Sequence, residues 1–269
     1  MPAIDLARLK KQVIRLADLF DQPEAFLHEL HEVLDFYVNR TLRTRRPVAP
    51  ASVLETYHTP ALVLRHIENE LAPLAKTRPN EAIELADALW EARYLETRLL
   101  AAFLIGCIPP HEDRLLVRLT AWSQQIRDPN VRAVLLTTSL ARLRTEAADR
   151  LLILVREWLH PARPRFWANG IQALLPLLEE TKYENLPPIF EIITPVIESS
   201  PAILQEDLKQ LIRALYHVSP AETTYFIKNL IKESQNPQMK VTLRRILPDL
   251  PPELQEQIRD LVRQPRVVQ

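Results

Sequence analysis

Proline follows a helix-capping residue at five places along the chain. In such a pair the polar side chain caps the first turn, and proline takes the first helical position, where no intrahelical hydrogen bond is lost. The pairs are Thr59-Pro60, Asp128-Pro129, Ser200-Pro201, Ser219-Pro220 and Asn236-Pro237. Ser219 is also followed three residues later by Glu222, the spacing of a capping box. These dipeptides predict a chain built from successive helices.

The balance of glycine and proline supports the same prediction. The chain has 2 Gly and 23 Pro, whereas the tight hairpins of a sheet protein favour glycine. No stretch alternates apolar and polar residues for long enough to predict a strand. The intervals Pro60–Pro79, Pro110–Pro129 and Pro201–Pro220 are equal, which indicates a two-helix repeat of about 38 residues.

Three tryptophans support this repeat, because Trp90, Trp122 and Trp158 each stand at the end of an apolar helical pattern. We therefore predict an all-α protein, an α-solenoid of HEAT-like helical repeats with about 12–14 helices. The helices expected after the first two are 61–76, 80–93, 95–108, 111–126, 129–145, 147–160, 164–180, 186–199, 201–217, 220–235, 237–248 and 252–263.

The first 58 residues are expected to form a separate N-terminal cap. Residues 3–21 and 24–40 each carry an apolar helical stripe. A loop over 41–59 follows, and three guanidinium groups lie near its start, those of Arg43, Arg45 and Arg46. Such a loop can contact a phosphate backbone or serve as a solvated linker. The repeat array is expected to be one continuous domain over 59–269.

The net charge and the cysteine content exclude few classes of function. The net charge is +0, so the chain as a whole has no bias towards polyanions. Only 8 of its 34 basic residues are lysine; this abundance of arginine suits phosphate contacts, or it reflects genome composition. The single Cys107 excludes an internal disulfide, and its apolar neighbours favour a buried, inert thiol.

No part of the sequence indicates a membrane protein. The N-terminus lacks the apolar core of a signal peptide, and no apolar run approaches ~18 residues. We therefore expect a cytoplasmic protein, and we expect it to be a monomer.

The stretch from Glu84 to Gly106 carries a family resemblance. It reads ELADALWEARYLETRLLAAFLIG, with Leu85, Leu89 and Trp90 in a Leu-x-x-x-Leu-Trp pattern and then Glu-x-Arg-x-Leu-Ala from Glu96. This pattern resembles the HEAT-like DNA alkylation repair family, the AlkD-type DNA glycosylases. The resemblance implies an array of helical repeats that binds duplex DNA, including damaged DNA, without a cofactor.

The resemblance also implies where excision residues would lie. An aromatic is expected at or just after Trp122, and a carboxylate one turn later to stabilise positive charge on the deoxyribose. In this chain those later positions are Ile126 or Arg127. A family arginine falls on Gly170. The usual carboxylate and arginine are therefore absent, so Trp122 and nearby Asp128 are the weak catalytic candidates. Asp128 also reads as an N-cap, and Trp122 as a core residue of the repeat.

Arginines in the middle repeats are the candidates for DNA binding on a concave surface. Arg163, Arg165 and Trp167 place two guanidinium groups and an indole near a helix N-terminus, which favours anions. Arg127 is a further candidate, together with the Arg43–Arg46 group. The alternative interpretation makes Trp167 a core residue.

Other site classes find little support. Two glycines cannot make a phosphate-binding glycine-rich loop, and the His28/His31 spacing matches no metal motif. We therefore expect neither metal nor cofactor. Three hypotheses remain open: a DNA-binding family member that has lost base excision, a HEAT-type scaffold for a protein partner, and an active glycosylase that uses Asp128.

Overall fold

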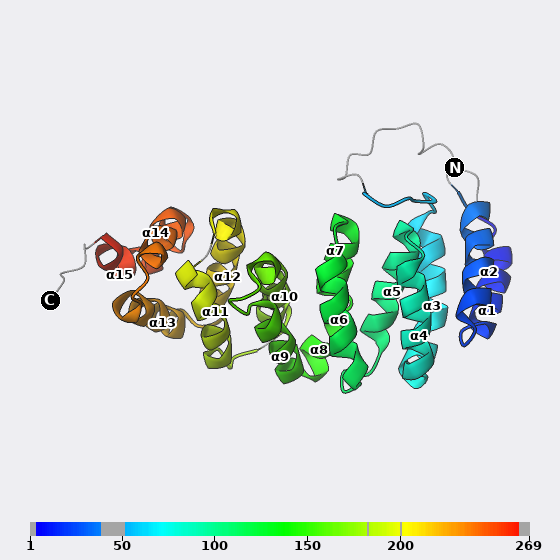
Figure 1. Ribbon diagram of the computed structural model, residues 1–269, viewed down its shortest axis with the longest axis horizontal. Helices are drawn as coiled ribbons and strands as arrows, with labels where there is room; N and C mark the ends of the chain where they lie inside the picture. Colours follow the sequence, from blue (N-terminus) through cyan, green and yellow to red (C-terminus); the bar gives the residue numbers. More distant parts are fainter. Residues whose placement is uncertain (1–3, 39–51, 182, 200, 264–269) are drawn as a thin grey trace. The chain divides into compact units, whose positions relative to one another are not determined.

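A computed structural model describes residues 4–38, 52–181, 183–199 and 201–263 (Figure 1). The described residues form α-helices and short 3₁₀ helices, and their one β-bridge is the isolated pair Glu55–Tyr94. The prediction of an all-α chain of HEAT-like helical repeats is confirmed. The chain divides into two compact units, Met1–Glu146 and Ala147–Gln269, and the boundary expected at residue 58 stays a prediction.

The first unit packs its helices in two rows. One row runs through α1, α3, α5 and α7, each contacting the next, and α2 packs on α4 in the other. Two stacked tryptophans, Trp90 and Trp122, continue that second row from α4 to α6. The helices of this unit are α1 (Leu6–Asp18), α2 (Pro23–Phe36), α3 (Ala61–Thr77), α4 (Pro79–Glu91), α5 (Leu95–Cys107), α6 (Asp113–Gln125), α7 (Pro129–Thr137) and α8 (Ala141–Glu146).

The second unit repeats this arrangement. Here α10, α12 and α14 contact one another in order, while α9 packs on α11 and α13 packs on α15. Its α-helices are α9 (Ala148–Trp158), α10 (Trp167–Glu180), α11 (Pro187–Ser199), α12 (Gln205–Val218), α13 (Pro220–Glu233), α14 (Pro237–Ile246) and α15 (Pro252–Arg263). Three short 3₁₀ helices complete it: η2 (Pro164–Phe166), η3 (Ala202–Leu204) and η4 (Leu247–Asp249).

Most of the capping pairs act as predicted. The Asp128, Ser219 and Asn236 side chains accept hydrogen bonds from amides in the first turns of α7, α13 and α14. Thr59 is different: Pro60 is itself the N-cap of α3, and the Thr59 hydroxyl donates to the Leu34 carbonyl (3.3 Å). The prediction that Thr59 caps α3 was wrong because a tertiary contact uses its side chain. Ser200 lies outside the described residues.

The single helix predicted over 129–145 is also wrong, because α7 ends at Thr137 and α8 begins at Ala141. The reason lies in α5, whose Gly106 faces the backbone of Thr138 and Ser139. The Ser139 hydroxyl donates to the Ala102 carbonyl, also in α5, and Arg144 donates to the Thr137 carbonyl (2.7 Å). These contacts compensate the backbone groups freed by the break.

The two glycines differ in what an added methyl group would meet. A Cβ at Gly106 would lie 2.5 Å from the Thr138 carbonyl oxygen, whereas one at Gly170 would lie 2.5 Å from Cδ2 of Leu159. Backbone cannot move aside cheaply but a leucine side chain can rotate. We expect Gly106→Ala to lower the free energy of unfolding by about 2–3 kcal/mol and Gly170→Ala by about 1 kcal/mol or less, since alanine's helix propensity offsets part of the strain. Urea denaturation followed by circular dichroism measures both, and equal losses would contradict this expectation.

Candidate functional site

The segment 52–60 lies across the N-terminal end of α5 and is held there by Glu96. This carboxylate is 3 % exposed. It accepts from the Thr56 hydroxyl (2.8 Å) and from the amides of Tyr57 (3.2 Å) and Thr59 (3.4 Å). Hydrogen bonds of this number compensate the burial of a charge. Glu96 is therefore a structural anchor, with its oxygens already occupied.

Asp128 anchors the other end of the same segment. Its Oδ2 accepts from the Ser52 hydroxyl (2.6 Å) and the Val53 amide (2.9 Å), and its Oδ1 accepts from the amides of Asn130 (2.9 Å) and Val131 (3.2 Å). Burial by itself raises the pKa of the Asp128 carboxyl, but these four hydrogen bonds more than offset it and hold the pKa below its ordinary value. The group is an N-cap and a tertiary anchor, already ionised and fully engaged.

The two tryptophans of the α4–α6 row form a closed stack. The ring centroids of Trp90 and Trp122 are 4.2 Å apart with the planes 1° from parallel, and the two residues are 1 % and 3 % exposed. Gln125 accepts from the Trp90 indole N–H (2.9 Å), and the Arg98 guanidinium lies 5.0 Å from the Trp90 ring centroid. The Arg98 guanidinium therefore lies over the Trp90 ring, and the Trp90 ring in turn covers one face of the buried Trp122 ring.

The polar residues of the family pattern now have physical roles. Glu96 and Arg98 are the Glu and Arg of Glu-x-Arg-x-Leu-Ala; Glu96 fixes the 52–60 segment, and the Arg98 Nε donates to the Trp90 carbonyl (3.1 Å). The sequence alone assigns no role to either residue. Their occurrence in the pattern was the one signal that could have identified them.

Arg127 is the described DNA-binding candidate of the first unit, and its positive charge is free to meet a phosphate. Its side chain is exposed, immediately before the Asp128 cap. Within the described residues it forms no ion pair and no hydrogen bond through its guanidinium. The sequence candidates Arg43, Arg45 and Arg46 lie outside the described residues.

The second unit brings Arg163, Arg165 and Trp167 together around η2. Arg163 pairs with Glu157 (2.8 Å), and the Arg165 guanidinium lies 4.6 Å from the Phe166 ring centroid. Both arginines are exposed, but Trp167 is 3 % exposed and donates its indole N–H to the His160 carbonyl (3.1 Å). The Arg165 guanidinium can therefore meet an anion directly, and that of Arg163 only in exchange for Glu157, while the indole of Trp167 belongs to the core.

Gly170, the position at which the resemblance expects an arginine, has no room for a long side chain. An added Cβ would already meet Cγ of Leu159 at 2.6 Å. Leu159 is buried against this turn of α10 at 1 % exposure. The local packing therefore suits glycine and does not accommodate a guanidinium on this face.

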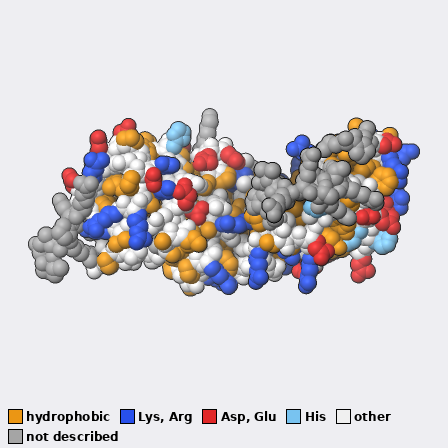
Figure 2. Space-filling model, turned by 90° about the horizontal axis from the view of Figure 1, so that it is seen from above, with side chains coloured by type: hydrophobic (Ala, Val, Ile, Leu, Met, Phe, Trp, Pro, Cys, Tyr) orange, Lys and Arg blue, Asp and Glu red, His pale blue; other side chains and the backbone are white. Residues whose placement is uncertain are grey.

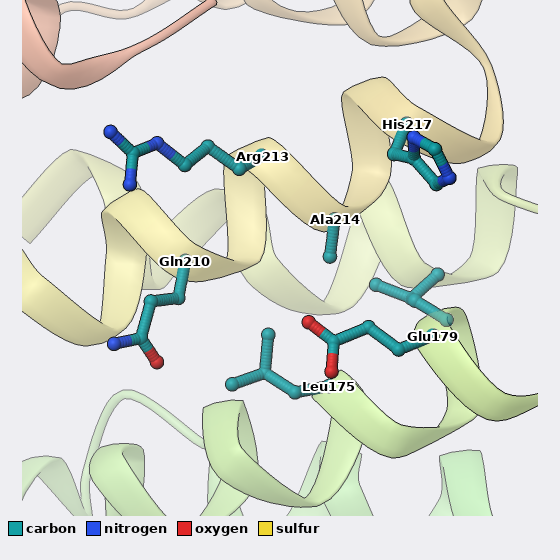
Figure 3. A pocket seen from close by; sticks show the side chains of 7 residues that line it. Leu175, Glu179, Gln210, Arg213, Ala214 and His217 are labelled. Carbon is teal, nitrogen blue, oxygen red and sulfur yellow. The ribbon is translucent and has the colours of Figure 1, made fainter.

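A shallow cavity of ≈ 460 Å³ lies between α10 and α12. Figure 3 shows Gln210, Arg213 and His217 along α12, with Leu175 and Glu179 on α10. Arg213 donates through Nε to the Asp249 carbonyl (2.6 Å). The cavity mixes apolar, acidic and basic groups, and its lining includes no serine, threonine or cysteine side chain.

Metal and thiol chemistry find no support in the described part of the chain. No three His, Cys, Asp or Glu side chains among those residues are arranged to hold a metal ion. Burial raises the pKa of the Cys107 thiol, which makes it a poor nucleophile. A search of the same residues finds no helix both long and apolar enough to span a bilayer.

The surface charge is mixed on the face seen in Figure 2. Lys and Arg side chains there are interspersed with Asp, Glu and hydrophobic side chains. Several arginines are paired, such as Arg118 with Asp87 (2.8 Å) and Arg142 with Glu146 (2.7 Å). Exposed arginines without a carboxylate partner, such as Arg127, are therefore the stronger candidates for contact with phosphate.

Helices packed in rows within each unit, with successive caps and buried tryptophans, define a HEAT-like helical-repeat protein. A family model described as "DNA alkylation repair enzyme" matches residues 58–262, about three-quarters of the chain. The chain belongs to the DNA alkylation repair enzyme family. No match was found among curated proteins or among solved structures.

Proposed function

We infer that this chain binds duplex DNA and does so without base excision by Trp122 and Asp128. The inference rests on membership of the DNA alkylation repair enzyme family. It is supported by the exposed guanidinium groups of Arg127, Arg163 and Arg165, a side-chain type suited to phosphate contacts. Arg43, Arg45 and Arg46 remain candidates from the sequence alone.

The two weak catalytic candidates are engaged in ways that conflict with excision. A carboxylate that stabilises positive charge on a sugar must present a free oxygen to it, whereas both Asp128 oxygens accept hydrogen bonds. An aromatic that contacts a lesion must expose its face, and the Trp122 ring is stacked on Trp90. Recognition of DNA, damaged DNA included, is therefore the better supported function.

Duplex binding at two salt concentrations tests this proposal. We expect a fluorescein-labelled duplex of about 20 bp to bind more weakly at 200 mM than at 50 mM NaCl, because phosphate contacts release counterions. The double variant Arg127→Ala/Arg165→Ala, at two exposed arginines that form no ion pair within the described residues, should make the slope of log K against log [salt] shallower by about 2, because each lost arginine leaves one phosphate fewer neutralised. Fluorescence anisotropy measures both quantities.

Arg156→Ala is the matched control, because Arg156 is an exposed arginine of the unit that holds Arg165 but is paired with a carboxylate, that of Glu191 (3.1 Å). Its salt slope should equal that of the wild type. Absent or salt-insensitive binding would refute DNA binding. Release of free methylated base from an alkylated duplex that is lost in Asp128→Asn, but kept in Ser52→Ala, would instead show excision by Asp128.

A protein-interaction scaffold is the second candidate function. The observation that favours it is an apolar groove between α11 and α13, lined by Phe190, Tyr225 and Phe226. Such a groove has no use in phosphate binding, and it suits an apolar protein surface.

A further inference from the structure

A groove of ≈ 630 Å³ lies between α11 and α13, two helices of the second unit that are labelled in Figure 1. It is lined from α11 by Pro187, Phe190 and Thr194, and from α13 by Ala221, Glu222, Tyr225, Phe226, Asn229, Leu230 and Glu233. The α13 residues recur at helical spacing along one face, so the groove follows the helix axis. Its shape is that of a trough about three turns long.

Aromatic rings make the walls of this trough. Phe190 and Phe226 stack with centroids 4.4 Å apart and planes 8° from parallel. Tyr225 is 70 % exposed beside them, whereas Phe190 and Phe226 are half-buried and Trp158 and Trp167 are buried. Exposed aromatic side chains that border an apolar cavity are typical of protein-binding sites.

The charges at the trough are of one sign. Glu222 and Glu233 stand at opposite ends of the α13 face, eleven residues or about 16 Å apart. No lysine or arginine is among the lining residues; Lys228 of the same helix instead donates to Gln257 (2.8 Å). An apolar middle with a carboxylate at each end repels phosphate and attracts a cation at both ends.

We propose that this groove binds an amphipathic helix of a partner protein, one with an apolar stripe and Lys or Arg near both ends. Its apolar side chains at i, i+4 and i+7 would lie over Phe190 and Phe226, and its basic ends would meet Glu222 and Glu233. This goes beyond DNA binding, which uses different residues. The two functions can therefore be separated by mutation.

A synthetic peptide serves as the probe. It is a fluorescein-labelled, hydrocarbon-stapled helix of about 15 residues with Leu at i, i+4 and i+7 and two Lys at each end. The full-length chain should bind it, and Tyr225→Asp should raise the Kd at least about tenfold by adding a charge at the aromatic wall. Val117→Asp is the matched control, since Val117 is 62 % exposed on α6 of the first unit and is not among the residues that line the groove.

Charge reversal tests the rim. Glu233 is the last residue of α13, where a lysine suits the helix dipole, so Glu233→Lys should fold normally. It should weaken binding of the Lys-ended probe about threefold or more and strengthen binding of a matched probe with Glu at its ends. Thermal unfolding of both groove variants checks that the fold is intact.

Three outcomes would overturn the proposal: no binding of the probe at about 100 μM, equal binding by wild type and Tyr225→Asp, or no response to the charge of the probe. A dimer in sedimentation velocity that Tyr225→Asp abolishes, with no probe binding, would assign the groove to a second copy of the chain instead. Duplex affinity should be unchanged in Tyr225→Asp, so failure here leaves the DNA proposal standing.

Discussion

Replacing Trp122 by alanine is expected to lower the free energy of unfolding by about 3–5 kcal/mol. The residue is 3 % exposed and its ring is stacked on Trp90 at 4.2 Å. Removal leaves a large cavity between α4 and α6 and takes away an aromatic pair, whose geometry adds to its area burial. Urea denaturation followed by circular dichroism at 222 nm measures the loss.

Trp122→Phe distinguishes this structural role from a role at the surface. Phenylalanine keeps a ring against Trp90 and should recover at least half of the lost stability. Val117→Ala, on the exposed side of the same helix, should change stability by less than about 0.5 kcal/mol. A stable Trp122→Ala protein that has lost only DNA binding would show instead that the indole faces the ligand.

Replacing Asp128 by alanine is expected to lower the free energy of unfolding by about 3 kcal/mol. The loss combines an N-cap, about 1 kcal/mol, with two tertiary hydrogen bonds from Ser52 and Val53 to a charged acceptor, at about 1 kcal/mol each. The carboxylate is 2 % exposed, so water cannot readily replace it. Ser219→Ala, at an exposed cap, should lose only about 1 kcal/mol.

The pH dependence of this effect has a defined sign. The pKa of Asp128 is lowered by folding from its ordinary value of 3.8, so ionisation of this group stabilises the folded state at any pH above that value. That stabilisation disappears as the pH falls below 3.8 through the lower pKa of the folded state. The stability difference between wild type and Asp128→Asn should thus be constant from neutral pH to about pH 4 and shrink below it. A difference that grows on acidification would contradict the assignment.

Much of the fold could be predicted because its signals are local. The caps at Asp128, Ser219 and Asn236 act within one turn of helix. The three repeat tryptophans each end a stretch whose apolar residues recur at the helical period. The predictions failed where a contact with a distant segment intervened. The Thr59 hydroxyl donates to the Leu34 carbonyl and so does not cap α3. The helix expected over 129–145 is interrupted where its backbone packs against α5.

The candidate site was less predictable, because its side chains also depend on contacts with distant segments. Arg127, Arg163 and Arg165 are candidates because they are basic; the structure places all three at the surface, and their contact with DNA stays a prediction. Trp122, Trp167 and Asp128 were named for the chemistry of their side chains, which does not reveal what surrounds them. Each proves to be buried.

The helical repeats and most of their caps follow from the amino-acid sequence alone, since helix initiation and apolar periodicity involve residues within a few positions of one another. The sequence also determined the family, through a pattern that runs over Glu84–Gly106. The roles of the polar residues depend on contacts between segments far apart in the sequence. Asp128 meets Ser52 across 76 positions and Glu96 meets Thr56 across 40. A carboxylate is an anchor or a catalyst according to whether such distant donors occupy its oxygens.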